Sequence, residues 1–435
     1  MKNKNLFVLV VLAVALGAWA WWSNHPKIGL APAAMGAKVL PDLPVNDVAT
    51  IQMTTAATNL TLAKEQGAWV VVSRKKYPAN FDKIADMLKD LRELKVGQVM
   101  AVTEKQRGQF KLMDPVPLST PSVADTQGTR VELFGANNKR LGSLLVGKTF
   151  MKKQAGGGME GMPNFGGYPM GQYVRTDKGQ VYLVAKTLER MTESANTWLD
   201  DAFVNVLAAD IRELTVTGPD RAAIRLWRTN DTDAMTIDGL KESEGTADAA
   251  KITQQCGGLN YLSFDDIAVA DLSDKDTGMG APVVYKAVTK EGMVYTLRIG
   301  QAVGPDRPDR YVKVGVSYDP ALDVTPAVSP DVTAAASNAP PAADKAKQAT
   351  DDKAKRAEAA KTANAKFEPW LYIVKQYRVE PLLLKRDELV KKPEPPPAPT
   401  PGTNTVAEAV KAQPESVPAP AVPQPPQAPS EMAVK

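Results

Sequence analysis

Two stretches of the chain, FDKIADMLKDLREL at residues 81–94 and AAKITQQCGGLNYL at residues 249–262, share one pattern of apolar side chains. In the first stretch these side chains recur with the i, i+4, i+7 spacing of a helix that has one apolar face. The second stretch repeats the pattern at a constant offset: Ile84, Leu88, Leu91 and Leu94 correspond to Ile252, Cys256, Leu259 and Leu262. The pattern therefore predicts two amphipathic helices and a duplicated domain.

Short alternating segments surround both helices in the same order. Three predicted strands precede the first helix at 48–53, 59–64 and 69–72, and three precede the second at 211–216, 223–228 and 235–237. A hairpin follows at 129–147 and at 283–300, and two further strands complete each copy, at 173–175 and 181–184 and at 311–313 and 370–374. The motif FKLMDP (110–115) corresponds to the segment that ends at Gly280-Ala281-Pro282.

This order of elements predicts the α+β class. We expect two repeated domains, 41–200 and 205–390, each with a mostly antiparallel sheet, one main helix and a short terminal helix. The strand pattern suits sheets that have one solvated face. Cys256 occupies the position of Leu88, so it is predicted to pack in the core of its domain.

The first 40 residues predict a membrane anchor. Residues 1–5 contain two lysines, and residues 6–22 (LFVLVVLAVALGAWAWW) contain no charge and end in tryptophans. This pattern is typical of a single transmembrane helix whose N-terminus is cytoplasmic, followed here by a Pro/Ala/Gly tether at 23–40. We therefore expect an inner-membrane protein of a bacterium, with the lipid bilayer as a partner and the bulk of the chain in the periplasm.

A cleaved signal peptide is the alternative reading of the same segment. Ala18-Trp19-Ala20 has the small-x-small form of a cleavage site. The bulky Trp21 and Trp22 that follow favour the uncleaved anchor. Both readings place the rest of the chain outside the cytoplasm.

Two segments have biased composition. Residues 319–366 hold 16 alanines, first with proline and then with lysine and aspartate. Residues 393–435 hold 13 of the 34 prolines. We expect a disordered insert at 319–366, whose second part could form a transient polar helix but has no apolar face to bury, and a disordered, Pro-rich tail.

Composition excludes several kinds of site. One cysteine and one histidine cannot form a disulfide or a Cys/His zinc site, and His25 lies beside the apolar N-terminal run. The formal net charge of +4 over 435 residues gives no basis for nucleic-acid binding. We expect a non-enzymatic protein with no catalytic residues, no metal and no cofactor.

Three motifs have a functional and a structural interpretation. Residues 142–149 (GSLLVGKT) match the letters of a phosphate-binding loop, but Ser-Leu-Leu-Val reads as a strand and no helix follows. The acidic run at 265–276 resembles a calcium loop only faintly, and we favour a solvated loop. The Gly/Met-rich loop at 152–171 is typical of a mobile insertion, yet its apolar side chains suit an adaptable partner surface. The candidate docking residues are Met159, Met162, Phe165, Tyr168 and Met170.

Several motifs together resemble the bacterial domain of unknown function 4340. They are Leu43-Pro44, Asp47-Val48, Leu60-Thr61-Leu62, Gly67-Ala68-Trp69, Tyr77-Pro78-Ala79, Phe110–Pro115, Leu145–Lys148 and Tyr173-Val174-Arg175. The resemblance covers about 40–200 well and about 205–390 more loosely. It implies a single-pass membrane protein that faces the exported side, and it carries over no catalytic residue.

The resemblance also implies a context, because some such proteins are encoded with ABC transporter components similar to those of gliding motility. Our leading hypothesis is a membrane-anchored periplasmic binding or scaffold protein. It would be accessory to an ABC-type transporter, with the permease and ATPase subunits as partners. The alternative is a structural or assembly protein of the cell envelope with no transporter link, in which the tail 393–435 docks to the wall.

Overall fold

The computed structural model describes residues 35–117, 120–152, 168–230, 233–323 and 342–391. The predicted anchor 6–22, the tail 393–435 and the residues Met159, Met162 and Phe165 lie outside these ranges. Within the described ranges, no helix combines the length and the apolar character that crossing a membrane requires.

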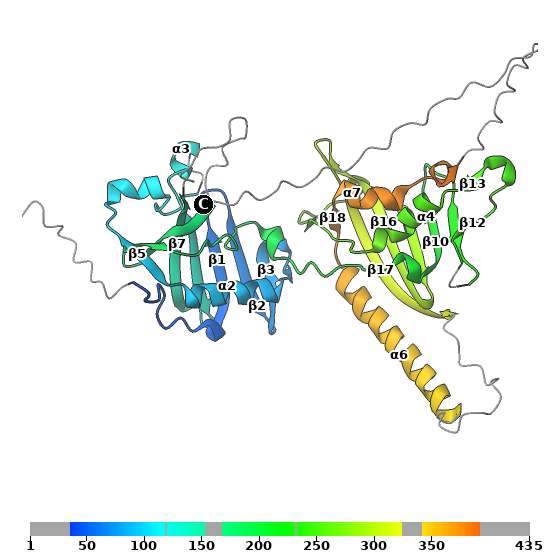
Figure 1. Cartoon of the computed structure of the whole chain (residues 1–435), viewed down its shortest axis with the longest axis horizontal. Coiled ribbons are helices and arrows are strands. Elements are labelled where there is room, and N and C mark those ends of the chain that lie inside the picture. The colour runs from blue at the N-terminus through cyan, green and yellow to red at the C-terminus, as the bar shows by residue number, and fades with distance from the viewer. Residues whose placement is uncertain (1–34, 118–119, 153–167, 231–232, 324–341, 392–435) are drawn as a thin grey trace, which may run out of the picture. The chain divides into compact units, whose positions relative to one another are not determined.

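The first part of the chain forms a nine-stranded antiparallel sheet with the order β4-β3-β2-β1-β6-β7-β8-β9-β5 (Figure 1). Its strands are β1 (Val48–Thr54), β2 (Asn59–Glu65), β3 (Ala68–Val71), β4 (Tyr77–Pro78), β5 (Val96–Met100), β6 (Thr129–Gly135), β7 (Arg140–Lys152), β8 (Tyr168–Thr176) and β9 (Val181–Val184).

The second part forms an eight-stranded sheet with the order β12-β11-β10-β15-β16-β17-β18-β14. Its strands are β10 (Ile211–Thr217), β11 (Ile224–Trp227), β12 (Thr236–Ile237), β14 (Asp266–Ile267), β15 (Val283–Thr289), β16 (Glu291–Gly304), β17 (Arg307–Asp323) and β18 (Tyr372–Val374). A separate two-stranded ladder joins β13 (Thr246–Ala247) to β19 (Val390–Lys391).

The two large sheets have the same topology, so the duplication and the α+β class are confirmed. Strand for strand, β3-β2-β1-β6-β7-β8-β9-β5 corresponds to β12-β11-β10-β15-β16-β17-β18-β14. The sequence patterns missed β5 and β14, which follow the helices and pair with the last strand of their own sheets.

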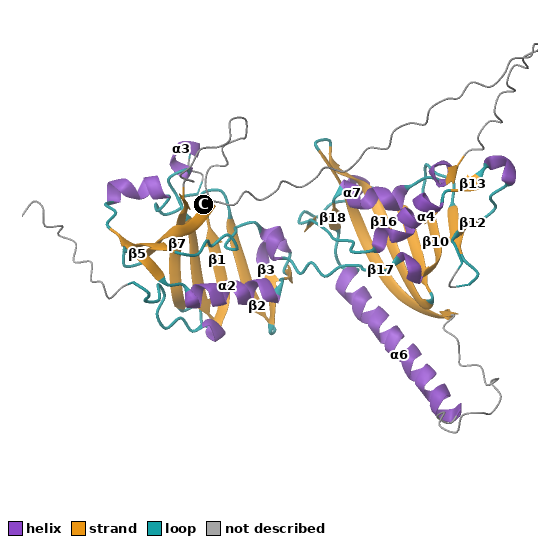
Figure 2. Ribbon diagram, in the orientation of Figure 1, coloured by secondary structure: helices purple, strands orange, loops and turns teal. Residues whose placement is uncertain are grey.

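The helices α2 and α4 carry the shared apolar stripe and cover one face of their own sheets (Figure 2). We call this the inner face. The described α-helices are α2 (Phe81–Glu93), α3 (Pro121–Ala124), α4 (Ala249–Cys256), α5 (Asp274–Thr277), α6 (Ala342–Phe367) and α7 (Gln376–Val379). Asn80 and Asp248 cap α2 and α4, because their side-chain oxygens accept from Lys83 N and from Ala250 N and Lys251 N.

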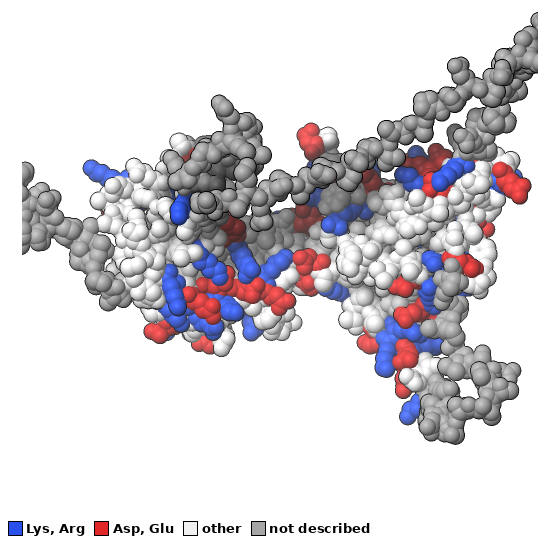
Figure 3. Space-filling model, viewed as in Figure 1, with Lys and Arg blue, Asp and Glu red and all other residues white. Residues whose placement is uncertain are grey.

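The shared apolar stripe lies in the core as its spacing predicts. Ile84, Leu88 and Leu91 are buried in the first domain, and Ile252 and Cys256 are buried in the second. Burial raises the pKa of Cys256 to about 12, so this thiol stays protonated at neutral pH. The opposite face of α2 is charged, and Figure 3 shows acidic and basic side chains intermingled over this helix.

The segment 198–200 is bound to β4 and its neighbours. Asn80 N donates to Trp198 O and Asp200 N donates to Pro78 O, at 2.8 and 2.9 Å. The ring of Tyr77 also packs against three aromatic rings from the second half of the chain: Phe264, Trp370 and Tyr372, with centroids 5.7, 4.9 and 6.3 Å away. Burial raises the pKa of Tyr77 to about 12.

The expectation of a disordered insert at 319–366 is wrong for the described part of that segment. β17 continues to Asp323, and α6 is a 26-residue helix, so α4 is not the main helix of its domain. Ala360 on α6 is only 2% exposed and packs in the core, although the sequence indicated no apolar face. Alanine is only weakly hydrophobic, so a narrow apolar stripe of alanines among lysines is hard to recognise in the sequence.

α6 also protects an edge of the second sheet. β18 pairs with β17 only at Arg310–Val312, which leaves the rest of that edge of β17 without a strand. Asn364 Oδ1 accepts from Val316 N at 2.9 Å, and Arg356 pairs with the fully buried Asp323 at 2.9 Å. An edge covered in this way cannot pair with another chain.

Ala360→Glu tests the packing of α6. The substitution places a carboxylate in the core, so we expect a loss of about 3 kcal/mol in the free energy of unfolding, or release of the helix. Chemical denaturation and limited proteolysis at the lysines of α6 measure the two effects. The neighbouring Ala359 is exposed, so Ala359→Glu should change stability by less than about 0.5 kcal/mol. Equal behaviour of the two variants would show that α6 does not pack.

Candidate functional site on the outer face of the first sheet

One row of cross-strand neighbours on the first sheet brings two arginines to the face opposite α2, which we call the outer face. Thr54 pairs with Arg130, Arg130 with Leu145, and Leu145 with Arg175. Directly paired residues point to the same side of a sheet. Leu145 belongs to a small core separate from the one that contains α2, so the row lies on the outer face.

A covering segment, which we define as residues 101–116, packs over part of this outer face. It contains the 3-10 helix η4 (Glu104–Phe110) and the fully buried Leu112. The ring of Phe110 lies 4.6 Å from the ring of Tyr173 on β8. Two motifs that carry the family resemblance, FKLMDP and YVR, are therefore in direct contact.

Gly147 on β7 allows this close packing. A Cβ at position 147 would clash with Phe110 O and would lie 2.6 Å from the Leu112 side chain. The strand reading of residues 142–149 is confirmed, because they lie inside β7. The glycine that resembles part of a phosphate-binding loop is a contact point for the covering segment instead.

The covering segment places Asp114 between the two arginines of the row. Arg175 Nη2 donates to Asp114 Oδ2 at 2.5 Å, and Arg130 Nη2 donates to Asp114 Oδ1. Arg130 also donates to Asp177 and to the Ser143 hydroxyl, each at 3.1 Å. Neither arginine is freely solvated, because their side chains are only 18% and 11% exposed.

These side chains line an open cavity of about 540 Å³. Its walls are Thr54, Asp114, Pro115, Arg130, Glu132, Arg140, Arg175 and Asp177. Burial, and then the positive charge of Arg175, lower the pKa of the Arg130 guanidinium, while Asp177 and Glu132 oppose this effect. Arg175 Nε is buried and has no hydrogen-bond partner in the described part of the chain.

The charges of this cavity balance. Three arginines face three carboxylates, and Arg140 joins Glu132 and Asp177 at 3.2 Å each. Guanidinium groups bind carboxylates strongly through parallel hydrogen bonds. The arrangement can hold the covering segment on the sheet, and a carboxylate from outside must compete with Asp114 to enter it.

The predicted docking residues that the structure describes lie close to one end of this sheet. Tyr168 and Met170 are on β8, opposite Lys152 and near Met151 of β7. Beyond Val146, β7 has no pairing with β6, so residues 149–152 and 168–171 form a two-stranded arm. Met151, Tyr168 and Met170 are 43%, 50% and 43% exposed on this arm.

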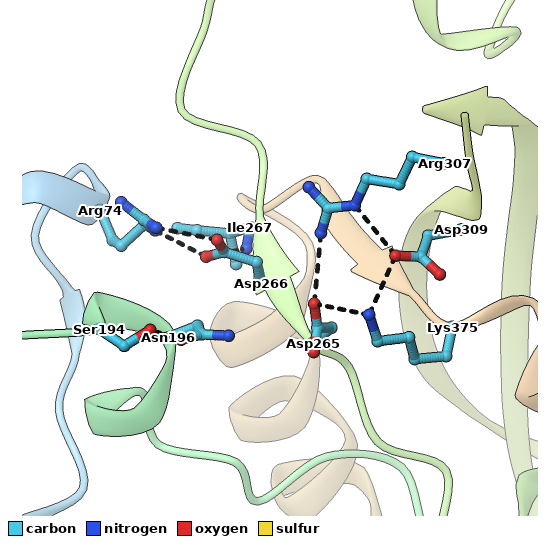
Figure 4. A network of polar contacts seen from close by, with 9 residues as sticks. All are labelled: Arg74, Ser194, Asn196, Asp265, Asp266, Ile267, Arg307, Asp309 and Lys375. Atoms are coloured by element: carbon cyan, nitrogen blue, oxygen red, sulfur yellow. Dashed lines mark hydrogen bonds and ion pairs between the residues drawn. The ribbon is translucent and has the colours of Figure 1, made fainter. Parts of the chain in front are cut away.

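Three carboxylates of the acidic run are held in ion pairs: Asp265 with residues of the second domain and Asp266 with Arg74 (Figure 4), and Asp271 with Lys75. Lys375 and Arg307 each lie between Asp265 and Asp309, at 3.0–3.2 Å. Arg74 donates to both oxygens of Asp266, at 2.6 and 2.9 Å. Among the described residues, no group of His, Cys, Asp and Glu side chains has an arrangement suited to holding a metal ion.

The family model described as "Domain of unknown function (DUF4340)" matches residues 69–155 and 165–282. The two matched regions cover just under half of the chain and are similar to this family in tandem. The tandem matches are separated by residues 156–164 within the Gly/Met-rich loop, and they include Asp114, Arg130 and Arg175. The resemblance inferred from the motifs is thus confirmed. No curated protein and no solved structure matches the chain.

The sequence patterns did not predict the charged cavity of the first sheet. Asp114 and Arg175 each lie in a motif that carries the family resemblance, and that was the available signal. Nothing local indicates that the two motifs meet, since 61 positions separate their charged residues.

Asp114→Ala tests the ion pairs of the charged cavity on the first sheet. The change leaves two half-buried guanidinium groups without a shared carboxylate, so we expect the free energy of unfolding to fall by about 1 kcal/mol. Urea denaturation measures the loss. Asp125, 80% exposed and 3.4 Å from Lys111, gives a matched control, and Asp125→Ala should cost less than about 0.5 kcal/mol. If both substitutions cost the same, Asp114 does not hold the covering segment.

Asp309→Asn tests the ion-pair network of the second domain. Burial alone would raise the pKa of Asp309, but hydrogen bonds from Arg307 and Lys375 hold that pKa below its usual value. The stabilisation from a carboxylate with a lowered pKa is complete above the unfolded-state pKa of about 4. It is lost as the pH falls through the folded-state pKa. The stability gap between wild type and Asp309→Asn should therefore be largest at pH 5–7 and shrink towards pH 3.

Urea denaturation at pH 7, 5 and 3 measures this gap. Asp306, exposed in the turn before β17, provides the control, and Asp306→Asn should change stability little at each pH. If the stability gap between wild type and Asp309→Asn stays constant across the three pH values, the pKa of Asp309 is not lowered by its ion pairs.

Proposed function

We propose that this protein is a non-enzymatic, membrane-anchored periplasmic binding or scaffold protein that is accessory to an ABC-type transport system. The anchor rests on the apolar run at 6–22. The transporter link rests on the family resemblance. The binding role is supported best by one structural observation, the apolar arm of the first sheet.

Side chains on this arm are suited to a partner interface. Met151, Tyr168 and Met170 are large and exposed, and they lie on paired strands of fixed register. Methionine adapts its shape to different partners, and tyrosine is enriched in protein interfaces. The arm also flanks the Gly/Met-rich loop, in which the sequence places more residues of the same kinds.

The corresponding arm of the second sheet has a different character. There β16 and β17 continue beyond β15 through the pairs Ala302–Arg310 and Gly304–Arg307. This arm carries arginines and no large exposed apolar side chain. The contrast supports the first domain as the site of the proposed apolar contact.

Co-purification of the full chain from native membranes, with crosslinking and mass spectrometry, tests the proposal. The test variant carries Met151→Ser, Tyr168→Ser and Met170→Ser. The control variant carries three equally drastic changes at exposed apolar positions of the second domain, Val269→Ser, Leu272→Ser and Tyr377→Ser. We expect wild type and control to recover an ATP-binding subunit and its permease, and the arm variant to recover at least about tenfold less.

Two outcomes contradict the proposal in different ways. Undiminished recovery with the arm variant removes the arm from the interface. Recovery of envelope or wall proteins alone, with crosslinks confined to 393–435, supports the structural role and removes the transporter link.

A further inference from the structure

The outer face of the second sheet is built like that of the first, but its charged residues differ. A Cβ at Gly300 would clash with Thr277 O and would lie 3.1 Å from the Met279 side chain. Gly147 stands in the same relation to Phe110 and Leu112. The segment that ends at Pro282 therefore covers the second sheet as the segment that ends at Pro115 covers the first.

The equivalence of the two covering segments can be followed residue by residue. Phe110 and Leu112 correspond to Thr277 and Met279. Two residues further along the chain, Ala281 stands where the first domain has Asp114. Between the paired positions, Lys111 and Gly278 both have positive φ, +54° and +72°. The second domain thus has a methyl group where the first has the carboxylate that neutralises its arginines.

The outer face of the second sheet still presents positive charge. Arg298 occupies the position of Leu145, and Lys313 occupies the position of Arg175, with the same cross-strand register. Both side chains are exposed, and within the described residues neither has an ion-pair or hydrogen-bond partner. Like charges directly opposite each other destabilise a sheet unless another group neutralises them.

These two cations line a cavity of about 390 Å³ that also offers neutral polar groups. Its walls are Thr296, Arg298, Lys313, Val314, Gly315, Val316, Ser317, Asn364 and Glu368. Asn364 Oδ1 is occupied by Val316 N, which leaves its Nδ2 as the donating end of the amide. Glu368 is the one carboxylate in this wall, so the cavity carries a net charge of +1.

We propose that this outer-face cavity of the second domain binds an oxyanion, a phosphate or a carboxylate group. Arg298 and Lys313 supply the charge, and Thr296, Ser317 and Asn364 supply further donors. The planar guanidinium presents two parallel N–H groups to such a ligand, and the ammonium adds a point charge. This proposal does not depend on the transporter link, and it holds for an oxyanion from any source.

Comparison with the first domain explains why we expect the ligand in the cavity of the second domain and not in that of the first. Asp114 already fills the space between Arg130 and Arg175, so an external anion must displace an internal one. The second covering segment has Ala281, and no carboxylate, at the position of Asp114. Arg298 and Lys313 can accept an anion from outside.

Calorimetric titration of the purified full chain in detergent, at constant ionic strength, tests the proposal with sodium phosphate and sodium acetate as probes. We expect saturable binding of at least one probe. The test variant combines Arg298→Leu, which restores the residue of the first domain, with Lys313→Ala, and should weaken binding at least about tenfold. Arg298→Lys should retain part of the affinity, because lysine keeps the positive charge but lacks the two parallel N–H donors of the guanidinium group.

The control variant removes the same net charge elsewhere. Lys353 and Lys361 are exposed on α6, so Lys353→Ala combined with Lys361→Ala lowers the charge of the domain without touching the cavity. Binding that survives Arg298→Leu with Lys313→Ala, or that falls equally in the control, overturns the proposal, as does a wild-type chain that binds neither probe. A preference for phosphate indicates a phosphate-bearing ligand, and a preference for acetate indicates an acidic side chain or chain terminus.

Discussion

The close approach of a covering segment to a glycine on the sheet determines the outer face of each domain. At Gly147 and at Gly300 a backbone carbonyl lies where any other residue would place its Cβ. A larger residue at either position must push the segment away from the sheet. The position of Asp114 over Arg130 and Arg175 depends on this contact, and so does the position of Ala281. The outer-face chemistry is therefore a consequence of a steric constraint within each sheet.

Much of the fold could be predicted because it rests on local periodicity. The stripe Ile84, Leu88 and Leu91 and its copy are short-range patterns, and their constant offset shows the duplication. The elements that were missed depend on distant partners. β5 and β14 are short, and they become strands by pairing with β9 and β18. α6 is stable because Ala360 and Asn364 contact the core and the edge of β17, which no pattern inside the segment indicates.

The charged cavity of the first sheet could not be predicted from the sequence for the same reason. Its arginines and carboxylates come from β6, β7, β8, the turn after β8 and the covering segment, and each looks like an ordinary surface charge in isolation. The family motifs marked the right places without indicating their chemistry. The glycine and lysine of the GKT pattern gave the opposite signal, because a strand that needs a glycine for packing can match the letters of a phosphate loop.

The two domains share a scaffold but differ in how they balance charge. The two copies have the same topology, and each has a covering segment, so they would bind alike if the fold alone determined binding. The covering segment, however, carries Asp114 in the first copy and Ala281 at the same position in the second. The first copy neutralises its own cations and so stabilises its covering segment. The second keeps Arg298 and Lys313 solvent-accessible, at some cost in cross-strand repulsion. Divergence at Asp114/Ala281 and at Leu145/Arg298 thus separates a copy whose outer face is closed by its own ion pairs from a copy whose proposed role is to accept a ligand there.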